Sequence, residues 1–354
     1  MKRIAIMLAV VCLFLSGCSL MSGEHLSVTP HESPVSGSQT ANLSVSDYGE
    51  LKAVLEGMVR TGTESTVINV ARYNQKLLDN GVKTAVTHLK ENYPLGSWAV
   101  EDVQYEIGTG GGQRVVSVNI SYIHGRSQIR QVRNVADMKE LEKQVAEALE
   151  ECVDSVVLLV GDYERKDLVQ LVEDYADSNP DTVMEIPAVA VGVYPNGDPG
   201  TRVVEVDFTY QTSRESLRQM QNQVRRVFSS AELYINSDSA PLQKYSQLYT
   251  FLMERYDYTI GTSITPAYSL LVHGVGNSEA FASIYSAMCR QAELECKVIS
   301  GTKNGEAWYW NLIRVDGQWL HVDLLEASRQ GGFYCSVHEQ MQSYIWDYSA
   351  YGET

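Results

Sequence analysis

Between about residues 48 and 240, short runs of β-branched residues alternate with segments whose apolar positions recur every three or four residues. This spacing predicts helices at 138–151 and 166–176, because side chains three and four positions apart share one face of a helix. Between them, the run at 155–160 is typical of a buried strand, and two further strands follow the second helix. The pattern therefore predicts mixed α/β structure in this part of the chain.

The same pattern occurs twice. Residues 114–122 (RVVSVNISY) and residues 202–210 (RVVEVDFTY) lie 88 positions apart and share five identical and three similar residues out of nine. Recurrence at a fixed offset indicates two tandem copies of one module. We place the copies at 48–135 and 136–240, each with the order helix, strand, helix, strand, strand.

A glycine run, GTGGG at 108–112, separates the last two strands predicted for the first copy. A phosphate-binding loop needs a helix N-terminus directly after it to supply backbone N–H donors, whereas a strand follows here. The second copy has the unrelated turn PNGDPG at 195–200 in the same place, so we interpret both segments as hairpin loops. Neither copy has a cluster of His, Cys or carboxylate residues, so we expect the modules to bind a partner or to act as spacers.

From about residue 241 the pattern changes. Strands are predicted at 296–301, 307–315 and 318–323, and the last two are joined by the turn Asp316-Gly317. Helical spacing precedes them, which predicts a helix packed on an antiparallel sheet. With the two modules, the expected fold class is α+β.

Composition and charge narrow the possible functions. The chain has 354 residues, of which 44% are hydrophobic and 20% charged, as in ordinary globular proteins of two or three domains. Its net charge of -16 opposes contact with phosphate backbones, which argues against nucleic-acid binding. No pair of cysteines has the CxxC spacing of a metal site, and we expect neither a metal nor a cofactor.

The N-terminus has the pattern of a lipoprotein signal. Lys2 and Arg3 precede a twelve-residue apolar run that is too short to span a bilayer, and Leu-Ser-Gly-Cys follows. This ending resembles the bacterial lipobox. The resemblance implies a signal peptide at 1–17, palmitate-type lipidation of Cys18, and a lipid anchor on the extracytoplasmic face of the cell membrane. Residues 18–47, rich in Ser, Thr, Pro and Gly, are expected to form a tether; the alternative is a soluble secreted protein with an incidental Cys18.

Four further cysteines remain in the mature chain. They are Cys152, Cys289, Cys296 and Cys335. Their low density does not suggest a disulfide scaffold. We expect buried thiols, or at most one or two disulfides whose pairing the sequence leaves open.

Short landmarks of one family occur in order through the last third of the chain. They are Gly274, EAFA at 279–282, VISG at 298–301, WN at 310–311, DGQW at 316–319 and VD at 322–323. Together they resemble the transglutaminase-like domain of the papain-like superfamily, as found in bacterial surface lipoproteins, and we place such a domain at 241–354. The resemblance implies acyl transfer by a triad of Cys, His and Asp, in which a thiolate attacks an amide.

Two members of this triad are changed. Ser278 occupies the position of the cysteine, Trp308 that of the histidine, and Asp323 is retained. A serine hydroxyl needs a base to take its proton, and an indole has an N–H donor but no basic lone pair. The resemblance therefore implies a domain that has lost catalysis and acts in binding or scaffolding, with an envelope protein, a peptide or a glycan as partner.

A working enzyme of the transglutaminase or peptidase type is the alternative. His321 lies two residues before Asp323 and would face the same side of a strand, so Ser278 and His321 could form a serine hydrolase pair. His273 is a weaker candidate base. Cys289, about three helical turns after Ser278, is more typical of a core residue than of a displaced nucleophile.

Two further hypotheses stay open at this point. The repeat modules could carry the function, with the C-terminal domain only stabilising them. The chain also contains 21 tyrosines, many of them in the last third. They could line an aromatic cleft for a glycan or peptide, and ordinary half-buried packing is the alternative.

Overall fold

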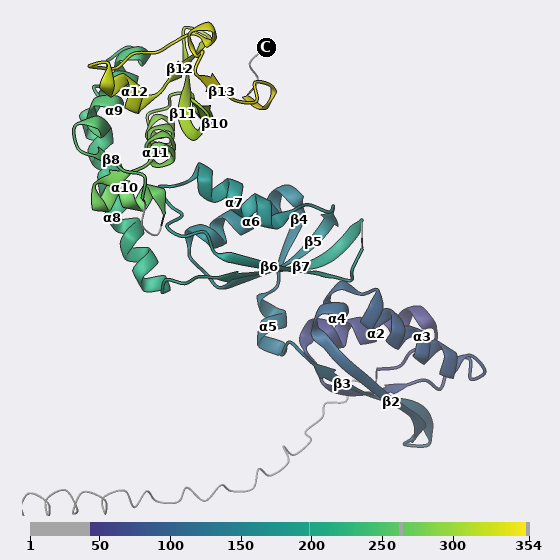
Figure 1. Cartoon of the computed structure of the whole chain (residues 1–354). Coiled ribbons are helices and arrows are strands. Elements are labelled where there is room, and N and C mark those ends of the chain that lie inside the picture. The colour runs from purple at the N-terminus through teal and green to yellow at the C-terminus, as the bar shows by residue number, and fades with distance from the viewer. Residues whose placement is uncertain (1–42, 198, 262–264, 352–354) are drawn as a thin grey trace, which may run out of the picture.

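The computed structural model describes residues 43–351, apart from 198 and 262–264 (Figure 1). The predicted signal peptide, Cys18 and nearly all of the tether lie outside the described residues. Within the described part of the chain, no helix has both the length and the apolar character needed to cross a membrane. Three bodies follow one another along the chain, each with a sheet and a buried core (Figure 1).

The first body packs helices on one face of a three-stranded antiparallel sheet of order β1-β3-β2. Its elements are α2 (Tyr48–Thr61), β1 (Ser65–Asn69), α3 (Leu78–Glu91), α4 (Pro94–Ala99), β2 (Val100–Gly110) and β3 (Gln113–Tyr122). Asp47 starts α2 by accepting a hydrogen bond from the Glu50 N–H, and Gly62 ends it in the left-handed conformation. Leu51, Leu55 and other apolar residues on one face of α2 are buried against the sheet.

The second body has a four-stranded sheet of order β4-β5-β7-β6, in which only β4 and β5 are parallel. Its elements are β4 (Arg133–Asp137), α6 (Met138–Glu150), β5 (Ser155–Tyr163), α7 (Leu168–Ser178), β6 (Ala188–Tyr194) and β7 (Gly200–Thr209). The short helix α5 (Arg126–Gln131), which precedes them, buries Ile129 in the core of the first body. The order β5-β7-β6 corresponds to β1-β3-β2 of the first body. The duplication of one module stays a prediction from the sequence. The predicted boundary between residues 135 and 136 falls within β4, which pairs with β5.

The first two bodies are packed against each other. Val203 of β7 is fully buried in the core of the first body, and Val157 and Leu159 of β5 pack against the same core. These three side chains alternate with residues of the second body's own core, because successive side chains of a strand point to opposite faces of the sheet. Each face of this sheet therefore contributes to a different core.

The third body packs α11 against a four-stranded antiparallel sheet of order β12-β11-β10-β13, as the sequence predicted. Its elements are α8 (Arg214–Tyr234), α9 (Pro241–Met253), β8 (Asp257–Tyr258), α10 (Pro266–His273), β9 (Val275–Gly276), α11 (Ser278–Gln291), β10 (Cys296–Lys303), β11 (Glu306–Val315), β12 (Gln318–Val322), α12 (Leu324–Arg329) and β13 (Tyr344–Ile345), with short 3-10 turns at His338–Gln340 and Ser349–Tyr351. The Asn311 amide of β11 donates to the Ala282 carbonyl of α11 at 2.9 Å, which ties the helix to the sheet.

The structure extends the predicted C-terminal domain toward the N-terminus. Leu217, Val224 and Phe228 of α8 are buried in the same core as α9 and α11, so this body begins before residue 241. The last predicted strand also ends earlier, at Val322, because the Asp323 carboxylate accepts backbone N–H groups and caps α12.

Candidate functional site

Ser278 lies at the start of α11. The helix begins there because Asn277 has an extended backbone and its side chain accepts a hydrogen bond from the Ala280 N–H at 3.0 Å. Ser278 is 7% exposed, and its hydroxyl oxygen accepts the backbone N–H of Tyr309 on β11 at 3.3 Å. The hydroxyl is therefore at a helix N-terminus and beside the strand that carries Trp308.

Asp323 is the centre of a buried hydrogen-bond network. Its Oδ2 accepts from the Trp308 indole Nε1 at 2.9 Å, from the Tyr344 hydroxyl at 2.6 Å and from the Lys303 ammonium at 2.8 Å. Its Oδ1 accepts from two backbone N–H groups at the start of α12. None of these five donors is an imidazole nitrogen, so the carboxylate is fully engaged without the partner that the triad requires.

Lys303 joins this network to a second carboxylate. Its ammonium is 2.9 Å from Glu326 Oε2, and its side chain is only 9% exposed. The hydrogen bond from Lys303 lowers the pKa of Glu326. Burial, and then the negative charge of Asp323, raises the pKa of the Tyr344 phenol, so Tyr344 acts as a hydrogen-bond donor at neutral pH. The side chains of Lys303, Trp308 and Tyr344 are thus hydrogen-bond donors to Asp323, and none of them acts as a base there.

Trp308 reproduces one half of the function of a catalytic histidine. Its buried indole N–H makes the hydrogen bond to Asp323 that an imidazole Nδ1–H makes in a triad. The indole has no second nitrogen with a basic lone pair, so it cannot take a proton from the Ser278 hydroxyl. The Tyr258 ring packs beside the indole at 5.8 Å, and the Lys303 ammonium lies 5.0 Å from its centre.

His321 is directed toward an aromatic cluster. It is 2% exposed, and its Nδ1 accepts the indole N–H of Trp310 at 3.0 Å. Its ring also lies 4.9 Å from Trp346 and 6.0 Å from His338. In a neutral imidazole whose Nδ1 accepts a hydrogen bond, Nε2 carries the proton. In this arrangement the ring offers no lone pair to Ser278.

The sequence of this region matches one known family. Residues 230–324 match the model of the Transglutaminase-like superfamily. This part of the chain is a transglutaminase-like domain. The match covers well under half of the chain, and it begins within α8, in agreement with the core described above.

Comparison with solved structures gives distant likenesses. One is a TGase that is 10% identical with a TM-score of 0.29; the match covers 52% of this chain and 55% of that one, so the chain spans just over half of its length. Another is calcium-bound LapG of Legionella pneumophila, 14% identical with a TM-score of 0.27, covering 39% of this chain and 75% of that one. At such scores these likenesses carry no functional argument. No curated protein matches the chain.

The remaining candidate base, His273, is exposed; among the cysteines, Cys152 and Cys289 are buried and Cys296 and Cys335 are half-buried. His273 is the last residue of α10, and its ring packs edge-on against Tyr268 with the ring centres 5.3 Å apart. All four described cysteines are free thiols. Burial raises the pKa of Cys152 and Cys335, and raises that of the fully buried Cys289 well above its ordinary value. A thiol with a raised pKa is a poor nucleophile at neutral pH.

Four tyrosines of the domain illustrate two different environments. Tyr245 and Tyr285 are fully buried, and their hydroxyls donate to backbone carbonyls, as expected of core residues. Tyr309 and Tyr351 instead line a groove next to Ser278. Of the tyrosines in the last third of the chain, Tyr309 and Tyr351 are the two that line this groove.

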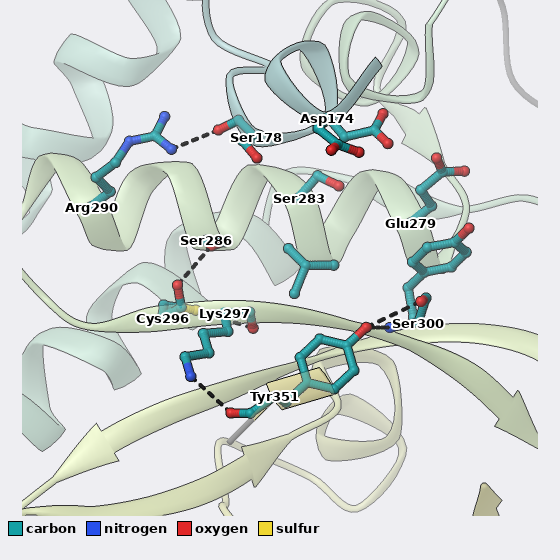
Figure 2. Close-up of a pocket in the computed structure, with 13 residues that line it drawn as sticks. Asp174, Ser178, Glu279, Ser283, Ser286, Arg290, Cys296, Lys297, Ser300 and Tyr351 are labelled. Atoms are coloured by element: carbon teal, nitrogen blue, oxygen red, sulfur yellow. Dashed lines mark hydrogen bonds between the residues drawn. The ribbon is translucent and has the colours of Figure 1, made fainter. Parts of the chain in front are cut away.

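This groove, which we call the α7–α11 groove, has a volume of about 520 Å³ and lies between α7, α11 and β10 (Figure 2). Asp174 and Asp177 of α7 line it together with Glu279 of α11. Figure 2 shows Asp174 and Glu279 at the same end. Burial, followed by the charge of Asp177, raises the pKa of Glu279, and burial followed by Asp174 raises the pKa of Asp177. Sequence reasoning missed this groove, because its two helices are about one hundred residues apart. Among its lining residues, only Glu279, Val298 and Ser300 belonged to sequence landmarks.

Proposed function

We propose that this protein is a membrane-anchored surface lipoprotein whose transglutaminase-like domain binds a partner and does not catalyse. One observation carries the proposal: the Trp308 indole donates to Asp323 at 2.9 Å in the place where an imidazole base is needed. Asp323 therefore orients a group that cannot deprotonate Ser278. The Ser278 hydroxyl keeps its position at the helix N-terminus but has no activating base.

The location of the protein is part of the same proposal. The apolar run and Leu-Ser-Gly-Cys at the N-terminus support cleavage before Cys18 and lipidation of that residue. Two acyl chains on one cysteine give stable anchoring without a basic patch, which suits a chain of net charge -16. The folded bodies would then act outside the cytoplasm, at the cell envelope, with a protein, peptide or glycan as partner.

The test is an assay of amine incorporation and amide hydrolysis on a casein-type substrate. We expect no activity from the wild type or from Ser278→Ala. The double variant Ser278→Cys, Trp308→His restores the thiol and the imidazole, and activity in it would show that the groove of an acyl-transfer enzyme is preserved. Wild-type activity that disappears in both Ser278→Ala and His321→Ala would instead establish the serine enzyme and overturn the proposal.

A further inference from the structure

We propose that the α7–α11 groove binds an extended peptide segment of a partner protein that carries lysine or arginine, and that this segment adds as a strand to the open edge of β10. The inference rests on the proposed binding role and names the class of partner. Three features of the groove lead to it: an unpaired strand edge, a cavity along that edge, and carboxylates that have no cation of their own.

The first feature is the edge of β10. The strand pairs with β11 from Cys296 to Lys303, but β13 pairs with it only at Thr302 and Lys303. Over the preceding residues, no strand of the described chain lies on the other side. The Ser300 N–H donates to the Tyr351 hydroxyl at 3.1 Å, away from β11, so by the alternation of a strand the backbone groups of Val298 face the same open side. An unpaired edge of this kind is a template for another chain.

The second feature is the cavity along this edge. Val298 and Ser300 of β10 and Ser283 and Ser286 of α11 line it. Figure 2 shows the two serines of α11 on the opposite side from Ser300. Its volume of about 520 Å³ lies in the range of ligand sites. The Ser286 hydroxyl already donates to the Cys296 carbonyl at 3.1 Å. The hydroxyls of Ser283 and, once Tyr351 is displaced, of Ser300 can donate to or accept from a bound backbone. The cavity therefore offers room and hydrogen-bonding groups beside the unpaired edge.

The third feature is the distribution of charge. The groove's basic side chains are already engaged: Arg290 donates to the Ser178 carbonyl and to Asp181, and Lys297 donates to the Tyr351 carbonyl at 2.8 Å (Figure 2). The three carboxylates at the other end, of Asp174, Asp177 and Glu279, form no ion pair within the described residues. Burial and repulsion from neighbouring carboxylates raise the pKa of Asp177 and of Glu279, so a cation entering the groove would be favoured. This selects a basic segment over an acidic one.

Tyr351 occupies part of the edge in the unbound protein. Its hydroxyl is 3.1 Å from the Ser300 nitrogen and 3.2 Å from the Ser300 hydroxyl. It belongs to the one-turn 3-10 helix Ser349–Tyr351, and its carbonyl also accepts from the Lys297 ammonium. An incoming strand would replace its hydrogen bond to Ser300.

The experiment measures binding of a fluorescein-labelled peptide of about eight alternating lysine and valine residues, a typical strand length, to the mature chain by fluorescence anisotropy at physiological ionic strength. The double variant Asp177→Asn, Glu279→Gln is expected to bind at least about tenfold more weakly. The control Glu91→Gln, Glu101→Gln removes two exposed carboxylates of the first body and should leave the affinity within about twofold. Equal weakening by both pairs would mean general attraction to an acidic protein and would overturn the inference.

A second probe tests strand addition itself. The same peptide with alternate backbone nitrogens methylated keeps its charge but loses the N–H donors that one edge of a strand needs. We expect both methylation registers to bind less well, and the one that removes the β10-facing donors to bind at least about tenfold less well. Unchanged binding of both methylated peptides, or equal binding of a glutamate-valine peptide, would overturn the inference. Cleavage or acyl transfer on the bound peptide would instead overturn the proposed function, so the two failures can be told apart.

Discussion

The indole of Trp308 shows how one side chain can keep a site folded and remove its chemistry. Its N–H satisfies Asp323, which is buried and also bound by Lys303 and Tyr344. A buried carboxylate without donors would cost several kcal/mol, so the position needs a donor whether or not the site is catalytic. A tryptophan supplies the donor without supplying a base.

The network around Asp323 predicts that Lys303→Met is strongly destabilising. The substitution leaves a buried carboxylate without its cation, which should lower the free energy of unfolding of this domain by about 3 kcal/mol. Lys143→Met, which removes the exposed pair with Glu147, should cost less than about 0.5 kcal/mol. Urea denaturation followed by tryptophan fluorescence is suitable, because four of the five tryptophans lie in the C-terminal domain. Similar small losses in both variants would contradict this account of Asp323.

The raised pKa of Glu279 predicts that Glu279→Gln increases the stability of the folded protein by an amount that depends on pH. The pKa in the folded state is above the ordinary value of 4.5, so ionisation of this carboxylate destabilises the folded protein at neutral pH. Below the unfolded-state pKa both states are protonated and the penalty disappears. The variant should therefore be more stable than the wild type at pH 7, and the difference should shrink as the pH falls through the raised folded-state pKa and disappear below about 4.5. Thermal unfolding across this range, with Glu91→Gln as a control for loss of one charge, checks the sign.

At the scale of elements, the short strand β13 supplies one of the hydrogen-bond donors to Asp323 from the edge of the sheet. It pairs with β10 only at Thr302 and Lys303, yet it carries Tyr344 to Asp323. The close approach of the two strands depends on Gly301, because a Cβ there would meet the Ile345 carbonyl oxygen and lie 2.9 Å from the Trp310 ring. The glycine that belonged to a sequence landmark is thus a packing requirement.

Gly301→Ala is therefore expected to separate β13 from β10 and to destabilise the domain by about 1–3 kcal/mol. Gly57→Ala is the matched control, since Gly57 lies within α2 and a Cβ would meet nothing within 4 Å. That change should stabilise its helix by about 0.5–1 kcal/mol. Denaturation of both variants, by tryptophan fluorescence and by far-ultraviolet circular dichroism, measures the two effects. A neutral Gly301→Ala would show that the contact with β13 can relax at no cost.

At the scale of the whole molecule, neighbouring bodies share core residues and form the groove between them. Val203 of the second body completes the core of the first, and α8, which follows β7, is buried in the third. The α7–α11 groove lies between the second and third bodies and exists only where they meet. A lipid at Cys18 would attach this assembly to a membrane through the residues before α2.

The proposed lipid anchor predicts that Cys18→Ser abolishes incorporation of labelled palmitate into the protein. The wild type, expressed with labelled palmitate, should incorporate the label and sediment with membranes, because two acyl chains give stable attachment. The variant should lose the label, and globomycin should block maturation of the wild type. Unchanged labelling of Cys18→Ser would contradict the lipobox interpretation.

The sequence by itself determined the local structure of this protein. Apolar spacing predicted α6, β5 and α7 and the antiparallel strands of the C-terminal domain, because periodicity reports which face of an element is buried. Short motifs identified the transglutaminase-like domain, because they occur in a fixed order along the chain. The positions of Ser278, Trp308 and Asp323 relative to these motifs marked them as the triad positions.

Only the tertiary structure decided what covers each buried face. The pattern of α8 predicts an apolar stripe but does not say that the third body buries it. Lys303 and Tyr344 reach Asp323 from β10 and β13, twenty or so residues away in either direction, and no spacing rule joins them. The α7–α11 groove depends on contacts between residues about one hundred positions apart. Such contacts arise from the packing of whole elements, and local periodicity carries no information about them.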